Sequence, residues 1–292
     1  MDSRSSGSDD PAFTGIRTAA VAGLGLIGGS IAREMAARGV RVLGHDRDPS
    51  TVAAAMRDGV VTGMLGDDFA GVEEADVFVV AVPVFAVREV LRVAGPRLGD
   101  ARLVTDAGST KRSIVALAEE MGIADRFVGA HPLAGDHRSG WDASRAGLFA
   151  GARVFLCPAS GAGEDAVALA DALWTALGGR TERVDAAEHD RRLAWTSHLP
   201  QAVSTALAVA LAERGIGRAD LGPGGRDVTR LAASSPDLWT DVLRDNADAV
   251  DDALAAVEAE IRALREAVAS GDADRIRDRF DRGRRWAGNG AG

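Results

Sequence analysis

The chain has 292 residues, 46% of them hydrophobic, so it is long enough to form two domains with cores of their own. A formal net charge of −9 argues against a nucleic-acid partner, which would need a basic surface to neutralise phosphates. Cys157 is the only cysteine, which leaves neither a disulfide framework nor a cysteine-based zinc site. We therefore expect a protein of the reducing cytoplasm.

The first residues carry no targeting signal that we can identify. Residues 1–15 are polar and lack the apolar core of a signal peptide, and no later segment reaches the length of a membrane span. We interpret residues 1–15 as a disordered tail and expect no association with a membrane.

Residues 16–187 alternate apolar, β-branched runs with segments of helical periodicity. The expected strands are 18–24, 40–45, 76–83, 101–108, 126–130 and 153–158, and the expected helices are 28–38, 50–58, 85–94 and 111–121. The apolarity of the strands is continuous rather than alternating, as is typical of parallel strands covered on both faces. This succession predicts an α/β domain of Rossmann type, built on a parallel sheet.

From residue 188 onward the pattern is helical, and we predict an all-helical domain over residues 188–292. It includes a long amphipathic stretch from Ser235 to Ser270, and we expect residues 283–292 to be frayed. Long amphipathic helices with few aromatic residues are easiest to explain if one face is buried against a second subunit. We therefore expect a homodimer.

A glycine-rich turn follows the first expected strand and opens the first helix. Gly23, Gly25 and Gly28 form the pattern G-x-G-x-x-G, which suits a tight turn, close approach of a pyrophosphate and close helix packing, respectively. With Leu26 and Ile27 between them, these residues are candidate contacts for a dinucleotide. A simple glycine turn is the alternative, since the chain has 35 glycines.

The second expected strand ends close to an acid that favours one cofactor. Asp46 follows Gly28 by 18 residues, where a carboxylate can bond the ribose 2′-hydroxyl of NAD. Arg47 beside it is a complication because an arginine can receive the 2′-phosphate of NADP. We favour NAD, since the Asp46 carboxylate would repel that phosphate.

Three loops at the carboxyl ends of later strands should meet at one edge of the sheet, where such folds bind ligands. They bring Pro83, Ser109 and His131 to the cofactor. His131 and His137 lie in the stretch GAHPLAGDHRSG, but they lack helical i, i+4 spacing and a third ligand nearby. We expect no metal site there.

Five stretches together resemble the prephenate/arogenate dehydrogenases of tyrosine biosynthesis. They are GLGLIGGS near the start, TDAGSTK at 105–111, GAHPLAG at 129–135, TSHLP at 196–200 and GGRDVTRLAASSPDLW at 224–239. The resemblance runs from about residue 18 to 250 and implies a Rossmann domain followed by a helical domain that forms a dimer.

The resemblance also implies roles for single residues. His131 matches the catalytic histidine that bonds the ring hydroxyl of the substrate, and Ser109 matches the serine that orients it near the nicotinamide. Arg230 matches the arginine that holds the ring carboxylate. His198 and Asp227 match residues that support the substrate pocket, and Trp239 matches a packing residue.

These residue types suit the reaction of prephenate, which loses a hydride from ring carbon 4 and carbon dioxide from ring carbon 1. A neutral histidine, with an unperturbed pKa of about 6.5, is a suitable base for the hydroxyl proton. An arginine suits the carboxylate because its planar fork bonds two oxygens and keeps its charge.

Three positions, at two places in the chain, depart from the family pattern. Asp136-His137 stands where many relatives have Thr-Glu, and Gln201 replaces a second histidine after SHLP. Arogenate carries an ammonium where prephenate carries a keto group, so an acid at Asp136 could favour arogenate. The alternative is that Asp136 only caps a turn, and 4-amino-4-deoxyprephenate is a third candidate substrate.

Two other classes of protein remain open. A β-hydroxyacid dehydrogenase would have a catalytic lysine in its helical domain, whereas the only lysine here is Lys111 in the first domain. A non-catalytic NAD-binding regulator would need neither a base at His131 nor an arginine at position 230.

Overall fold

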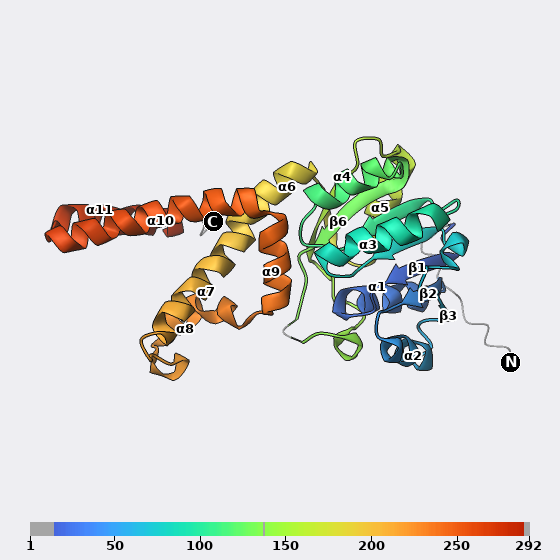
Figure 1. Cartoon of the computed structure of the whole chain (residues 1–292), viewed down its shortest axis with the longest axis horizontal. Coiled ribbons are helices and arrows are strands. Elements are labelled where there is room, and N and C mark those ends of the chain that lie inside the picture. The colour runs from blue at the N-terminus through green and yellow to red at the C-terminus, as the bar shows by residue number, and fades with distance from the viewer. Residues whose placement is uncertain (1–14, 137, 289–292) are drawn as a thin grey trace. The chain divides into compact units, whose positions relative to one another are not determined.

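The computed structural model describes residues 15–136 and 138–288, which form two compact units (Figure 1). The first unit contains residues 15–192 together with Ser234–Asn246, and the second contains Leu193–Ala233 together with 247–288. The boundary predicted between residues 187 and 188 stays a prediction. Apart from Gly15, the expected disordered tail lies outside the described residues.

The first unit is built on a sheet of eight strands in the order β3-β2-β1-β4-β5-β6-β7-β8. The strands are β1 (Thr18–Ala22), β2 (Arg41–His45), β3 (Gly63–Met64), β4 (Val77–Val80), β5 (Leu103–Asp106), β6 (Phe127–Pro132), β7 (Arg153–Pro158) and β8 (Arg180–Arg183). All neighbours are parallel except β6 and β7, which pair antiparallel with His131 opposite Phe155. The predicted Rossmann-type sheet is confirmed.

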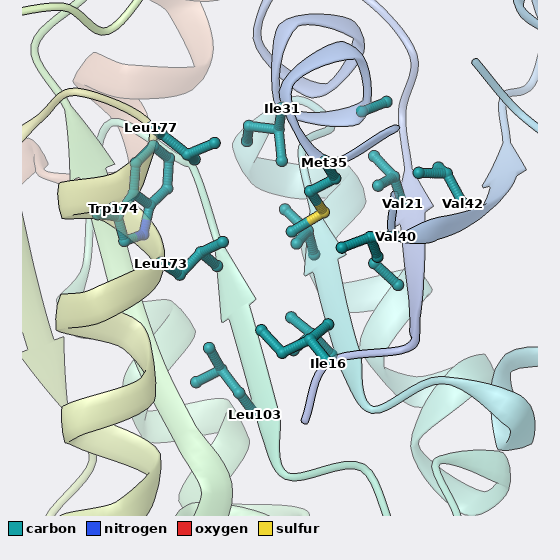
Figure 2. Packing of buried hydrophobic residues seen from close by; sticks show 14 of the residues in the cluster. Ile16, Val21, Ile31, Met35, Val40, Val42, Leu103, Leu173, Trp174 and Leu177 are labelled. Carbon is teal, nitrogen blue, oxygen red and sulfur yellow. The ribbon is translucent and has the colours of Figure 1, made fainter. Parts of the chain in front are cut away.

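Helices cover both faces of this sheet, which explains the continuous apolarity of its strands. One apolar cluster joins the sheet to α1 (Leu26–Ala37), α2 (Pro49–Arg57) and α5 (Glu164–Ala176), and Figure 2 shows Ile31, Met35 and Trp174 within it. The other cluster joins the opposite face to α3 (Val84–Ala94) and α4 (Arg112–Glu120). In the central strands β1, β4 and β5, alternate apolar residues contribute to the two clusters, and every position is buried.

The remaining segments are helical. They are α6 (Ala186–Leu193), a π-helical turn (Ala194–His198), α7 (Leu199–Ala212), α8 (Pro223–Val228), α9 (Pro236–Asp245), α10 (Ala247–Ser270) and α11 (Ala273–Gly288). Single 3₁₀ turns lie at Val72–Glu74, Gly95–Arg97, Ala124–Arg126, Trp141–Ala143, Arg218–Asp220 and Arg230–Ala233. Within the described ranges, no helix combines the length and the apolarity that crossing a membrane requires.

The structure gives two details of the helical part. The expected amphipathic stretch from Ser235 to Ser270 consists of two helices, α9 and α10, which are separated at the buried Asn246. Residues 283–288, expected to be frayed, are helical as the last residues of α11. Just before them, Arg279 and Arg282 of α11 pair with Glu260 of α10 at 3.6 and 3.7 Å, and these ion pairs join the two helices.

The glycines of the turn between β1 and α1 should differ in their tolerance of a side chain. A Cβ atom at Gly28 would lie 1.9 Å from the Gly23 carbonyl oxygen, whereas one at Gly25 would meet nothing within 4 Å. Gly28→Ala should therefore lower the melting temperature, through overpacking of about 1–3 kcal/mol or more, and Gly25→Ala should not. Equal melting temperatures for the two variants in thermal unfolding would contradict this packing.

Candidate active site

The turn after β1 has the shape of a dinucleotide-binding loop. Gly23 adopts φ +89°, and its position beside the Ala81 carbonyl leaves no room for a Cβ atom. Gly28 brings α1 close against β1, and Gly25 occupies the N-cap of α1 with open space beside it. The loop therefore offers backbone amides and the positive end of a helix dipole to an anion.

Asp46 lies directly beyond β2, next to this loop. Its carboxylate accepts the Leu24 backbone N–H at 2.8 Å and the Asp48 backbone N–H at 3.0 Å. These two bonds hold the carboxylate at the edge of the glycine loop, where a ribose hydroxyl of a bound dinucleotide would lie. Arg47, which sequence analysis weighed against it, is exposed.

A buried ion pair lies at the carboxyl ends of β5 and β6. The Asp106 carboxylate pairs with the ammonium of Lys111, and both side chains have no exposed surface. Asp106 also accepts the backbone N–H groups of Gly108 at 2.7 Å and Ala130 at 3.2 Å. Gly129 leaves room for the lysine, because a Cβ atom there would lie 3.2 Å from the Lys111 Cδ.

This ion pair joins the two loops that carry the predicted catalytic residues. Ala130 directly precedes His131, which is 9% exposed near the end of β6. Ser109 is half-buried in the loop that Gly108 opens. Pro83, at the end of β4, is the N-cap residue of α3 and is exposed.

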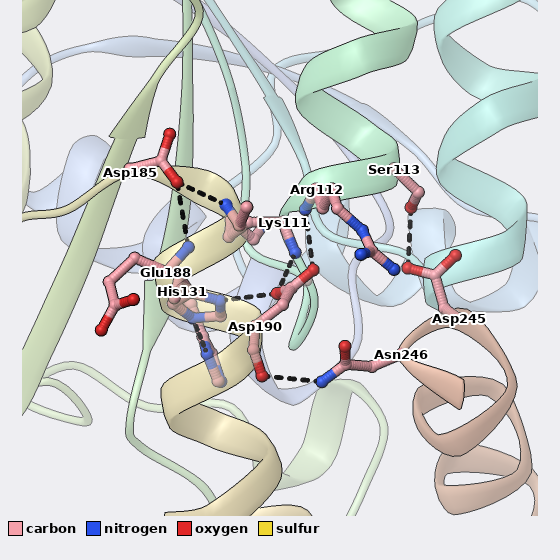
Figure 3. Close-up of polar contacts among 12 residues, drawn as sticks. Lys111, Arg112, Ser113, His131, Asp185, Glu188, Asp190, Asp245 and Asn246 are labelled. Carbon is pink, nitrogen blue, oxygen red and sulfur yellow. Dashed lines mark hydrogen bonds and ion pairs between the residues drawn. The ribbon is translucent and has the colours of Figure 1, made fainter. Parts of the chain in front are cut away.

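Behind His131 lies a second histidine that sequence analysis did not select. The Nδ1 atom of His131 is 2.9 Å from Nε2 of His189, and the Nδ1 atom of His189 is 2.8 Å from a carboxylate oxygen of Asp190. Figure 3 shows His131, Asp190 and Lys111 gathered at this place. His189 and Asp190 lie on α6 and are 0% and 2% exposed.

Asp190 also holds the start of α4 and the end of α9. Its two carboxylate oxygens accept the backbone N–H groups of Lys111 at 2.8 Å and Arg112 at 2.9 Å, while its own carbonyl accepts from the Asn246 side chain at 2.8 Å. The Ser113 hydroxyl donates to Asp245 at 2.7 Å. These contacts, visible in Figure 3, explain why residues 234–246 pack with the first unit.

The charge states of this pair follow from its surroundings. Burial lowers the pKa of His189, although the hydrogen bond to Asp190 opposes that shift. Burial raises the pKa of Asp190, but the hydrogen bonds from His189 and from the backbone of Arg112 and Lys111 outweigh it and hold the pKa below the usual value. His189 is thus neutral and Asp190 ionised near neutral pH.

In the loop after β6, two arginines form ion pairs with Asp136. The Asp136 carboxylate pairs with the guanidinium groups of Arg145 at 2.9 Å and Arg138 at 3.3 Å, and its side chain is only 11% exposed. It also accepts the Arg138 backbone N–H at 3.1 Å, as a turn-capping residue does. His137 lies outside the described residues.

The second unit holds the other predicted substrate contacts. His198 is buried at the end of the π-helical turn, whereas Asp227 and Arg230 are exposed near the end of α8. Within the described residues, neither the Asp227 carboxylate nor the Arg230 guanidinium makes a hydrogen bond or an ion pair. Gln201 fixes the turn after Arg230, since its side chain donates to the Leu231 carbonyl at 2.8 Å.

Trp239, predicted to be a packing residue, is half-buried on α9, in the first unit. In the ranges that the structure describes, no group of three or more histidine, cysteine, aspartate and glutamate side chains is arranged to hold a metal ion.

Sequence analysis missed His189 and Asp190 because their partners lie far away in the sequence. His189 is 58 residues from His131, and Asp190 is 79 residues from Lys111. The only local signal is a histidine followed directly by an acid on a helix that begins after the last strand. No motif spacing connects that dipeptide to the loop after β6.

The order of the strands, the glycine loop and the polar strand ends define a chain with a dinucleotide-binding domain of Rossmann type. Comparison with protein families shows which family the chain belongs to. Residues 31–183 match the model described as prephenate dehydrogenase, nucleotide-binding domain, and residues 185–282 match prephenate dehydrogenase, dimerization domain. The chain belongs to the prephenate dehydrogenase family, as the resemblance predicted.

Individual relatives agree with this assignment. The chain is 35% identical over 272 residues to a cyclohexadienyl dehydrogenase of Zymomonas mobilis, covering 89% of this chain and 92% of the relative. It is 33% identical over 272 residues to a prephenate dehydrogenase of Bacillus subtilis, covering 89% and 72%. A crystal structure of prephenate dehydrogenase from A. aeolicus with hydroxyphenyl propionate and NAD+ matches with a TM-score of 0.84 at 29% identity, covering 94% and 98%.

Removing one partner of the buried ion pair between Asp106 and Lys111 should destabilise the protein far more than removing one partner of a surface pair. Lys111→Met would leave a buried carboxylate without its cation, and we expect it to lower the free energy of unfolding of the first unit by about 3–5 kcal/mol. Arg41→Met is the matched control, because it breaks an exposed pair with Glu74 and should cost at most about 1 kcal/mol. Similar urea midpoints for the two variants would contradict the assignment of Asp106 as a charged, buried anchor.

Proposed function

We propose that this protein is an NAD-dependent dehydrogenase that oxidises prephenate with loss of carbon dioxide to give 4-hydroxyphenylpyruvate. The observation that carries the proposal is the buried His131, held at the carboxyl end of β6 on the sheet that also carries the glycine loop. Membership of the prephenate dehydrogenase family supports the choice of reaction. The names of the relatives from Z. mobilis and B. subtilis support it too.

The residues around the glycine loop fit NAD. The open space beside Gly25 suits a pyrophosphate, which the backbone of Gly23, Leu26, Ile27 and Gly28 would hold from the turn and the first turn of α1. Asp46 would accept a ribose hydroxyl, which favours NAD over NADP. The A. aeolicus relative was solved with NAD+ bound.

Pro83 and Ser109 follow strands β4 and β5, so we assign them to the nicotinamide end of the cofactor. When bound, NAD+ accepts the hydride that leaves ring carbon 4.

His131 would act as the base that draws off the hydroxyl proton of the substrate while the hydride leaves. Its position suits this role because it is fixed on a strand rather than on a free loop, and the buried contact behind it limits its rotation. Ser109 would orient the histidine and the hydroxyl group. Aromatisation of the ring on loss of carbon dioxide then makes the reaction irreversible.

Three residues of the second unit would recognise the substrate. Arg230 is proposed to bind the ring carboxylate, since its guanidinium is exposed and suits bidentate bonding to an anion. His198 and Asp227 are proposed to support that pocket. Gln201 would hold the Arg230 turn through its bond to Leu231, in place of the histidine that the family pattern has there.

A homodimer is the proposed assembly. Residues 185–282 match a domain described as a dimerization domain, and the second unit exposes large apolar side chains on α10 and α11. Ile261, Phe280 and Trp286 are 59%, 68% and 82% exposed, and a hollow of about 660 Å³ lies among Trp195, Ile261, Leu264 and Trp286. A second copy of the chain would bury this surface. The cytoplasmic location expected from the sequence stays a prediction.

The contacts of Asp136 favour prephenate over arogenate. A carboxylate that already pairs with Arg138 and Arg145 presents no free negative charge to an ammonium group, and the three side chains together carry net positive charge. Prephenate is the more anionic substrate, so this environment suits it. Arogenate and 4-amino-4-deoxyprephenate stay alternative substrates, and a non-catalytic NAD-binding protein is the alternative of another class.

Absorbance of NADH with prephenate and NAD+ tests the proposed reaction. The wild-type protein should form NADH and release carbon dioxide, and His131→Asn should lower kcat by about 10²- to 10⁴-fold because the base is lost. The Kd of NAD+, measured by protein fluorescence, should stay unchanged and serves as the control. If none of prephenate, arogenate and 4-amino-4-deoxyprephenate gives NADH, the result would support the non-catalytic alternative. If His131→Asn turns over prephenate at a near-native rate, His131 is not the base.

Substrate choice is tested by kcat/KM for prephenate and arogenate in the wild type and Asp136→Asn. We expect a preference for prephenate in both proteins, since Asp136 serves to hold Arg138 and Arg145. A wild-type preference for arogenate that Asp136→Asn abolishes would instead identify Asp136 as the receptor of the ammonium group.

A further inference from the structure

We propose that Asp190 and His189 form a hydrogen-bonded relay that fixes the tautomer of His131, with the proton on Nδ1 and the basic lone pair on Nε2. His189 and Asp190 are positioning residues in this proposal, because they act through His131. The relay itself rests on the hydrogen-bond distances among Asp190, His189 and His131, and its catalytic consequence rests on the proposed function.

The direction of each hydrogen bond follows from Asp190. An ionised carboxylate only accepts hydrogen bonds, and that of Asp190 accepts backbone N–H groups at both oxygens, from Lys111 and Arg112. The Nδ1 atom of His189, 2.8 Å from the same carboxylate, must therefore carry a proton and donate it. The helix start of α4 thus keeps Asp190 charged and aimed at His189.

The tautomer of His131 follows from the neutrality of His189. Burial disfavours its charged form, and the nearby ammonium of Lys111 acts in the same direction, so a single proton resides on the ring. That proton is on Nδ1, which leaves a lone pair on Nε2. The Nδ1 atom of His131, 2.9 Å from that lone pair, must be the donor, and the basic nitrogen of His131 is Nε2.

The surroundings hold both rings in these orientations. The Phe155 ring packs edge-on against His189 at 5.3 Å, and the rings of His131 and His189 meet edge-on at 5.1 Å. The charged groups around His189 are Asp190 on its own helix, Asp106 from β5 and Lys111 from the start of α4. The charges of Asp106 and Lys111 cancel because the two side chains form an ion pair. The carboxylate of Asp190 is therefore the uncompensated charge beside His189.

The relay would serve the proposed reaction in two ways. It fixes the lone pair of His131 on Nε2, the ring nitrogen that does not contact His189, and it gives the imidazolium formed after proton uptake a neutral acceptor backed by a carboxylate. Loss of that acceptor should therefore slow the transfer of the hydroxyl proton to His131.

Two substitutions of His189 separate the relay from a merely structural role. In His189→Gln, the side-chain amide can donate to Asp190 and its carbonyl can accept from His131, so the direction of both bonds is kept. His189→Phe fills the same space and keeps neither bond. We expect kcat of the Gln variant to stay within about tenfold of wild type, and that of the Phe variant to fall by about 10²- to 10⁴-fold.

The tautomer is measured directly by ¹⁵N NMR of the histidine side chains in the full-length protein. The chain has 5 histidines, so His131 is assigned from the signals that His131→Asn removes. We expect a protonated Nδ1 and an unprotonated Nε2 in wild type and His189→Gln, and a mixture of tautomers in His189→Phe.

A wild-type His131 with the proton on Nε2 would overturn the relay, as would equal losses of kcat in the Gln and Phe variants. The two proposals fail separately. The expected tautomer in a protein that does not turn over prephenate would refute the proposed function alone, whereas turnover that depends on His131 with the opposite tautomer would refute the relay alone.

Discussion

A charge buried in a protein must be surrounded by hydrogen-bond donors or counter-ions, and this constraint governs the carboxyl edge of the sheet. Asp106 and Asp190 are 0% and 2% exposed. Between them they accept from the Lys111 ammonium, the His189 ring and four backbone N–H groups at strand ends and a helix start. Each donor belongs to a segment that carries or supports a candidate catalytic residue. The hydrogen bonds that stabilise the two carboxylates therefore also hold the residues of the site in place.

The same constraint explains why the first unit includes segments that follow its last strand in the sequence. α6 and α9 follow the last strand in the sequence, yet α6 presents Asp190 to the start of α4, and Asn246 at the end of α9 binds the Asp190 carbonyl. A carboxylate that stabilises a helix start also orients His189, and His189 orients His131. Stability and proposed catalysis therefore depend on one buried network, which includes Lys111, the only lysine of the chain.

Much of this fold was predictable because its signals are local. Continuous apolar runs identified the six central strands, and the glycine spacing identified the loop that Gly23, Gly25 and Gly28 form. The strand β8 has the sequence RTER and β3 is two residues long, so neither carries an apolar signal. The antiparallel direction of β7, the break at Asn246 and the pair of His189 and Asp190 arise from contacts between distant segments, which no periodicity records.

We infer that the buried network holds the site in its working arrangement before any ligand binds. Amide hydrogen exchange of the ligand-free protein measures this most directly, through the backbone N–H groups of Lys111, Arg112 and Ala130, which donate to Asp190 and Asp106. Their exchange should be as slow as that of the central strands β1 and β4. Exchange as fast as that of the exposed Asp48 amide would mean that the two carboxylates do not order the loops and would contradict the account.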